Sequence, residues 1–119
     1  MVVRSIDEAE AFITADGSEI RELLGIPTAP VANQSLAEAT LRPGQATQRH
    51  FHRVAEEIYY LIEGGGRMEV DGVERDVHVG DAILIPPGAW HQLHNPGPGR
   101  LRLLCSCAPA YTHADTFFA

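Results

Sequence analysis

From about Gln34 onward, apolar residues recur at every second position in short runs, and each run is bounded by Gly, Pro, Asn or Asp. Alternation with period two is typical of β-strands joined by turns. Asp71-Gly72 is a hairpin signal, and Pro86-Pro87-Gly88 ends a run sharply. So many short strands at regular spacing indicate an all-β sandwich or barrel. The pattern predicts strands over residues 34–41, 46–52, 57–63, 67–72, 74–80, 81–86, 90–95 and 101–107.

The residues before this region follow a different pattern. The stretch SIDEAEAF (residues 5–12) has the composition of a short helix capped by Ser5. In SEIRELL (residues 18–24), the apolar positions Ile20, Leu23 and Leu24 fit a helix better than a strand. The next stretch, GIPTAPVAN, contains two prolines, which suit a connector and not a central strand. We therefore expect a short irregular or helical N-terminal segment.

The length of 119 residues fits one domain with one hydrophobic core. We expect an N-terminal extension over about residues 1–32, a barrel over about 33–108 and a C-terminal tail over about 109–119. Sixteen acidic and nine basic residues give a formal net charge of −7, and the arginines are scattered along the chain. This charge argues against nucleic acid and anionic membranes as partners. Because the sequence also shows no bilayer-spanning apolar run and no signal peptide, we expect a cytoplasmic protein.

Cys105 and Cys107 are the two cysteines of the chain, and a strand would place both on one face. A disulfide between such near neighbours would close a trivial loop with poor geometry. We interpret them as reduced core residues and not as a redox or metal-binding pair.

Two histidines and a glutamate stand close together in the stretch RHFHRVAEEIYYLIEG, residues 49–64. On a strand, His50 and His52 point to the same side, and Glu57 begins the next predicted strand. His91 follows the Pro-Pro-Gly turn and starts another strand. Three imidazoles and one carboxylate suit a divalent transition metal such as iron, manganese, zinc, nickel or cobalt. The spacing alone leaves an alternative open, in which these histidines and Glu57 are exposed and solvated.

The same residues fall into two motifs that resemble those of the cupin superfamily. The first motif has Gly44, five residues, His50-x-His52, four residues, Glu57, six residues and Gly64. The second has Gly80, five residues, Pro86-x-Gly88, two residues, His91, three residues and Asn95. The resemblance implies a jelly-roll barrel, or double-stranded β-helix, with one divalent metal held by His50, His52, Glu57 and His91.

The first motif leaves a choice between Glu56 and Glu57. The six-residue spacing to Gly64 favours Glu57. Strand alternation agrees if the strand begins at Glu57, since Glu56 then faces solvent.

Cupins include dioxygenases, isomerases and lyases, so the resemblance implies a metal-dependent enzyme that acts on a small organic substrate. It also implies a homodimer, because cupins commonly associate through their N-terminal strands. The alternative is a non-catalytic barrel that binds or senses a small ligand. The chain has no lysine, so a neutral or apolar substrate is favoured. An acidic substrate would need an inward-pointing arginine among Arg67, Arg75, Arg100 and Arg102.

Several other side chains are candidates for the cavity. Tyr59 is in phase with Glu57 and is the candidate proton carrier, with a core tyrosine as the alternative. Gln48 is in phase with the histidines and either lines the cavity or lies on its rim, and Leu61 shares the face of Glu57.

The positions of the remaining polar and aromatic residues can also be predicted. Tyr60 has the opposite parity to Tyr59 and is expected outside the cavity. We expect His78 and His94 on the surface, Trp90 at the rim and Asn95 in a turn. The tail carries Tyr111, His113 and Asp115, and either folds over the barrel or a partner chain, or forms an edge strand or a frayed end.

Overall fold

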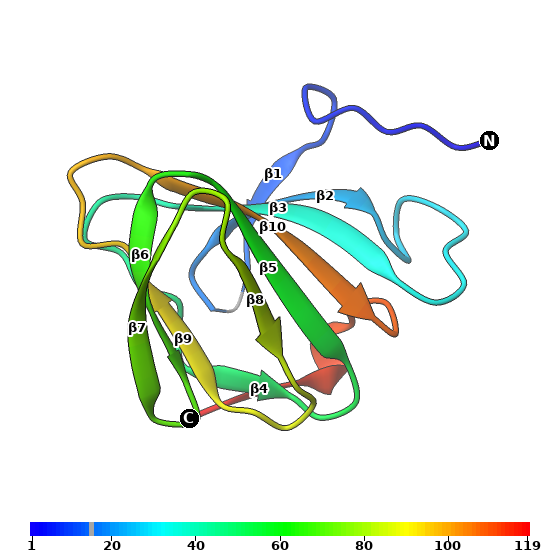
Figure 1. The fold of residues 1–119 in the computed structure, drawn as a ribbon. Coiled ribbons are helices and arrows are strands. Elements are labelled where there is room, and N and C mark those ends of the chain that lie inside the picture. The colour runs from blue at the N-terminus through cyan, green and yellow to red at the C-terminus, as the bar shows by residue number, and fades with distance from the viewer. Residues whose placement is uncertain (15) are drawn as a thin grey trace.

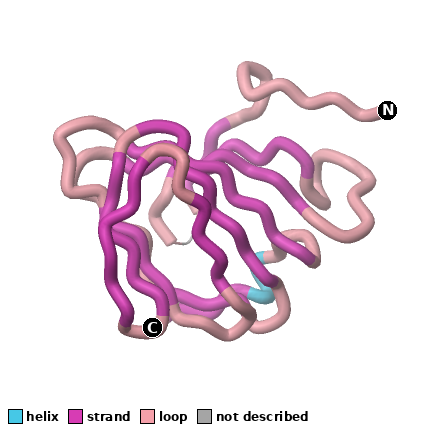
Figure 2. The backbone as a smooth tube through the Cα atoms, viewed as in Figure 1, coloured by secondary structure: helices cyan, strands magenta, loops and turns pink. Residues whose placement is uncertain are grey.

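The computed structural model describes residues 1–14 and 16–119, and it consists of two antiparallel sheets that face each other (Figures 1 and 2). The six-stranded sheet has the order β1 (Ala11–Ile13), β2 (Glu19–Leu24), β3 (Ser35–Leu41), β10 (Leu101–Ala108), β5 (Glu56–Glu63) and β8 (Ala82–Ile85). The five-stranded sheet has the order β11 (Thr116–Phe118), β4 (His50–His52), β9 (His91–His94), β6 (Gly65–Val70) and β7 (Val73–His78). Neighbouring strands far apart in sequence produce the jelly-roll barrel that the resemblance to cupins implies.

The hydrophobic core lies between the two sheets, because alternate residues of each strand point inward. In β5, Glu57, Tyr59 and Leu61 are buried, whereas Glu56 and Tyr60 are exposed. Burying one large apolar side chain contributes roughly 1.5–3 kcal/mol, so these inward rows stabilise the barrel. The fully buried apolar side chains are Leu41, Leu61, Ile85, Leu93, Leu101 and Leu103.

All eight strands predicted between residues 34 and 107 are confirmed as β3 to β10, with ends that differ by a few residues. β4 is the largest difference, since it begins at His50 and not at Ala46. The hairpin signal is also confirmed, because Asp71 and Gly72 join β6 to β7 with φ angles of 48° and 85°. Two successive positive φ angles are typical of the tight hairpin turn that matches strand twist.

The helices expected near the N-terminus are wrong. Ser5 accepts backbone hydrogen bonds from Glu8 and Ala9, but this turn does not continue into a helix. Glu19–Leu24 of this stretch form β2, which pairs with both β1 and β3. The free edge of β3 supplies backbone partners that outweigh the helical spacing of Ile20, Leu23 and Leu24. Within the described residues, no helix is long and apolar enough to cross a membrane.

The C-terminal tail folds back over the barrel. After the 3-10 helix η1 (His113–Asp115), strand β11 pairs with β4, so Thr116 lies opposite His52 and Phe118 opposite His50. The Asp115 carboxylate accepts hydrogen bonds from the backbone N–H groups of Val54 and Ala55. The tail therefore supports the loop between β4 and β5. The boundaries at residues 32 and 108 stay a prediction.

Candidate metal centre

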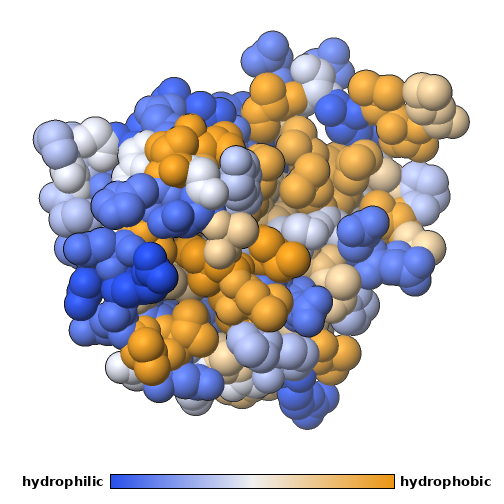
Figure 3. Space-filling view, viewed as in Figure 1, coloured by the Kyte–Doolittle hydropathy of each residue, from blue (hydrophilic) through white to orange (hydrophobic). Residues whose placement is uncertain are grey.

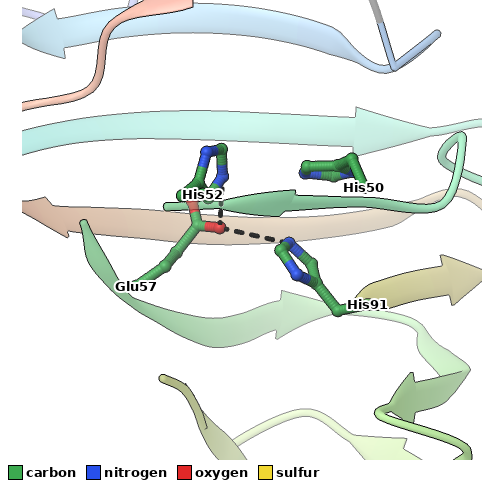
Figure 4. A group of neighbouring side chains, drawn as sticks. All are labelled: His50, His52, Glu57 and His91. Carbon is green, nitrogen blue, oxygen red and sulfur yellow. Dashed lines mark ion pairs between the residues drawn. The ribbon is translucent and has the colours of Figure 1, made fainter. Parts of the chain in front are cut away.

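Four buried side chains meet inside the barrel, where the two sheets face each other (Figure 4). His50 and His52 come from β4 and His91 from β9, all in the five-stranded sheet, while Glu57 comes from β5 in the opposite sheet. His50 and His91 lie directly opposite each other across the β4–β9 pair. One donor atom from each of the four residues lies within 4.8 Å of the other three, so the cluster could hold a metal ion.

Backbone and side-chain contacts orient the three imidazole rings. Nδ1 of His50 lies 2.7 Å from the carbonyl oxygen of Gln48, and Nδ1 of His91 lies 3.0 Å from that of Ala89. A carbonyl oxygen can only accept, so each Nδ1 carries a proton, and in a neutral ring the lone pair that can bind a metal is then on Nε2. Nδ1 of His52 lies 3.2 Å from the Thr116 hydroxyl. These contacts fix the rings in the way that metal-binding histidines require.

Glu57 places one carboxylate oxygen between two of the rings. Its Oε1 lies 3.2 Å from His52 Nε2 and 3.5 Å from His91 Nε2. Two donor atoms that each lie about 2.1 Å from one ion, at a tetrahedral angle, are about 3.4 Å apart. Glu57 Oε1 and His91 Nε2 are also fully buried and have no hydrogen-bond partner within the described residues. Because buried polar atoms are rarely left unpaired, this donor set fits a cation at its centre.

Burial and the neighbouring side chains of the cluster shift the pKa values of its residues. Burial acts to raise the pKa of Glu57, but the close approach of His52 and His91 outweighs it and lowers the pKa to about 2. Burial, followed by the nearby His91, lowers the pKa of His50. For His52, burial acts downward, yet Glu57 raises its pKa overall. The carboxylate is therefore ionised at neutral pH and supplies the negative charge that a divalent cation needs.

The second oxygen of Glu57 has a partner of its own. Cys107 lies opposite Glu57 across the β5–β10 pair, and its Sγ lies 3.2 Å from Glu57 Oε2. Burial, followed by the charge of Glu57, raises the pKa of Cys107, so the thiol stays protonated and donates this hydrogen bond. Both cysteines are free, as the sequence predicts. The contact with Glu57 is an additional finding that strand alternation alone did not indicate.

A cavity opens beside the four residues and is lined by both sheets and by the tail. Its apolar wall includes Ile20, Ala39, Leu41, Leu93, Leu103 and Phe118. Tyr59 lines the cavity with its ring centroid 6.0 Å from that of His91, and Tyr111 lines it from the tail. Burial raises the pKa of Tyr59 well above its ordinary value, so its hydroxyl keeps its proton.

Two other cavity predictions turn out differently. Gln48 is exposed, because residues 47–49 form a loop to which strand alternation does not apply, and it is not among the residues that line the cavity. Its backbone carbonyl still orients His50. Leu61 is buried, as expected from its parity, but it packs in the core cluster with Leu101 and Leu103 and not along the cavity wall.

Three of the remaining residues are exposed, as the sequence predicts. Tyr60, His78 and His94 are exposed. Trp90 packs edge-on against Phe51, with ring centroids 4.6 Å apart. Asn95 is buried and joins the loop around it, since its amide donates to the carbonyl oxygens of Leu41 and Gly99.

Asp16 is a cavity residue that the sequence did not indicate. It lies between β1 and β2, and its Oδ2 is 4.0 Å from His50 Nε2. The Asp16-Gly17 dipeptide is a turn signal, but the barrel contact depends on how β1 and β2 join the sheet.

Comparison with known proteins agrees with this fold. A family model described as the cupin domain matches residues 37–107. The chain is 44% identical over 110 residues to an uncharacterised protein, MJ1618, of Methanocaldococcus jannaschii, and the match covers 92% of this chain and 88% of that protein.

Solved structures include two informative neighbours. One is a predicted oxalate decarboxylase of Thermotoga maritima, with 25% identity, a TM-score of 0.79 and coverage of 92% of this chain and 99% of the other. The other is Streptomyces Pac13, described as a nucleoside dehydratase and solved with uridine. The match covers 100% of this chain and 91% of Pac13 at 18% identity and a TM-score of 0.81, which is a likeness of fold alone.

Proposed function

We propose that this chain, which belongs to the cupin family, is a metal-dependent enzyme that acts on a small organic molecule inside its barrel. In this proposal His50, His52, Glu57 and His91 hold one divalent transition metal. The reaction belongs to the dioxygenase, isomerase or lyase types. A bound divalent ion would supply Lewis-acid chemistry or the activation of O2.

One observation carries the proposal: Glu57 Oε1 and His91 Nε2 are buried and unpartnered within the described residues, and they face each other at 3.5 Å. Leaving a buried polar group unpaired costs about 1–3 kcal/mol. Among the described residues these two atoms make only ion pairs within the cluster, and a cation at its centre would provide a partner for both. The donor set therefore favours a cation site over a structural polar cluster.

Tyr59 is the residue we propose as the proton carrier. It lines the cavity beside His91, and its hydroxyl keeps its proton because burial raises its pKa. A protonated hydroxyl at this position can donate a hydrogen bond to a substrate oxygen, or a proton to a developing negative charge. Glu57 lies two residues earlier on the same face of β5, which places both groups in one cavity.

We also propose that two copies of the chain associate. β1 and β8 form the two edges of the six-stranded sheet, and Phe12 and Ile13 on β1 are exposed. Figure 3 shows hydrophobic side chains gathered over β5 and β8, where Ile58 and Leu84 are exposed. Open edges and apolar patches favour pairing with a second copy. Light scattering at several protein concentrations tests this, and a constant monomer mass contradicts it.

A binding or sensor barrel without turnover is the alternative function. It would use the same four residues to anchor a ligand, so the geometry of the cluster does not separate the two. The enzyme is favoured by Tyr59, which adds a proton donor to the cavity and has no role in simple metal anchoring.

The test is elemental analysis of protein purified without added metal, followed by activity screening with the metal found, in air and under nitrogen. Consumption of O2 supports a dioxygenase, and turnover under nitrogen supports an isomerase or lyase. Tight metal binding without turnover of any substrate class supports the binding barrel. Absence of any bound or bindable divalent metal contradicts the proposal.

A further inference from the structure

Asp16 is held in place over the cavity by the loop that precedes β4. The backbone N–H of Gln48 donates to the carbonyl oxygen of Asp16 at 2.7 Å, and the amide of Gln45 donates to that of Gly17 at 2.6 Å. The position of Asp16 is therefore fixed by contacts outside its own hairpin.

The two oxygens of the Asp16 carboxylate have different surroundings. Oδ1 accepts three hydrogen bonds, from the Thr14 hydroxyl at 2.6 Å, the Ser18 hydroxyl at 2.6 Å and the Ser18 N–H at 2.9 Å. Oδ2 receives no hydrogen bond from the described residues and lies 4.0 Å from His50 Nε2, at the edge of the metal cluster. Oδ2 is therefore an acceptor that is available to a molecule bound in the cavity.

The charge around this acceptor is unfavourable for an anion. The cavity is lined by three acidic residues, Asp16, Glu22 and Glu57, and by neither arginine nor lysine among the described residues. A divalent ion would bring two positive charges, against the three carboxyl groups of Asp16, Glu22 and Glu57. A bound carboxylate or phosphate would then lie in a low-dielectric cavity without a compensating charge, which is costly.

We infer that Asp16 is a specificity-determining residue that selects a neutral substrate with a hydroxyl group placed to donate to Oδ2, and that it rejects carboxylates and phosphates. The apolar wall, including Leu41, Leu93 and Phe118, receives the carbon skeleton of that substrate. This inference rests on the proposed function, since it assigns a substrate class to the same cavity.

The test compares two probes of similar size, benzyl alcohol and benzoate, by calorimetric or NMR titration of zinc-loaded and metal-free protein. The wild-type protein is expected to bind benzyl alcohol about tenfold more tightly than benzoate in both forms. In Asp16→Asn, the amide replaces the free acceptor with a donor, so the affinity for benzyl alcohol falls and that for benzoate rises. Asp76→Asn removes the same charge from an exposed site on β7 and is expected to keep the wild-type preference.

Three results would overturn the inference: equal or tighter binding of benzoate by the wild-type protein, an unchanged ratio in Asp16→Asn, or no binding of benzyl alcohol. The comparison of probes on the wild-type protein needs no variant, so it tests the inference even if Asp16→Asn fails to fold. Zinc content is measured in the same samples. Failure to bind zinc contradicts the proposed function, while the metal-free titrations still test Asp16 separately.

Discussion

Cys107 and Glu57 face each other across the β5–β10 pair, and the Cys107 thiol donates to Glu57 Oε2 at 3.2 Å. The other oxygen, Oε1, is thereby turned toward His52 and His91. Groups that orient a ligand carboxylate in this way affect metal binding even when they do not touch the metal, so we expect Cys107 to contribute to the proposed metal site.

Removing the thiol is therefore expected to weaken metal binding. Cys107→Ala should lower the affinity for zinc by about 10-fold or more, because Glu57 loses the partner that orients it. Cys107→Ser keeps a donor and should recover most of the affinity. Cys105→Ala is the matched control, since Cys105 lines the same cavity without a hydrogen bond to Glu57. Zinc titration in the presence of a competing chelator measures all three variants. Equal affinities for Cys107→Ala and Cys105→Ala would refute the role of Cys107.

The tail should contribute to stability through Asp115. Asp115→Ala removes the acceptor for two backbone N–H groups, at Val54 and Ala55. Hydrogen bonds to charged groups contribute about 1.5–3 kcal/mol each, so we expect the loss of two at the lower end of this range to cost about 3 kcal/mol and to decrease Tm by about 12 °C. Asp76→Ala, at an exposed carboxylate, should change Tm little. Thermal unfolding of both variants tests this, and similar small shifts would contradict it.

Metal removal should destabilise the protein as a whole. Without an ion, Glu57 Oε1 and His91 Nε2 remain buried with no hydrogen-bond partner among the described residues. A ligand present at about 100 times its Kd stabilises the folded state by about 2.7 kcal/mol, which corresponds to an increase in Tm of about 10 °C for a chain of this size. Calorimetry of protein treated with EDTA, before and after zinc is restored, measures the difference. An identical Tm in both states would argue against a metal site.

Tyr59 should affect turnover without affecting metal content. Tyr59→Phe removes only the hydroxyl, and loss of a general acid lowers kcat by about 10²–10⁴-fold. Tyr60→Phe is the natural control, because Tyr60 is exposed on the opposite face of β5. If Tyr59→Phe retains full kcat on the substrate identified by screening, Tyr59 is a wall residue and the proton carrier lies elsewhere.

The sequence predicted those features that depend on local alternation. Strand parity places His50, His52 and Glu57 inward and Glu56 and Tyr60 outward, and the structure agrees at each of these positions. The β5 strand begins at Glu56, one residue earlier than expected, but the alternation is unchanged. Strand alternation predicts these positions correctly because it depends only on the two-residue period of a strand and on one face of the strand being buried.

The features that the sequence did not predict depend on contacts between distant residues. Cys107 meets Glu57 only through the register of β5 against β10, and Asp16 reaches the cavity only because β1 and β2 extend the sheet beside β3. The helix wrongly predicted at residues 18–24 has the same cause, because the segment forms a strand through backbone partners that lie in the distant strand β3. Short-range patterns contain no information about which strand edge a segment will join.

The most direct test of the metal site compares two neighbouring glutamates. Glu57 is 5% exposed and lies within the cluster, whereas Glu56 points to solvent on the same strand. Both exchanges to Gln remove one negative charge at nearly the same place in the sequence. Metal content of the purified proteins, measured by elemental analysis, should be abolished or sharply reduced in Glu57→Gln and unchanged in Glu56→Gln. Full metal content in Glu57→Gln, or its loss in Glu56→Gln alone, would contradict the account.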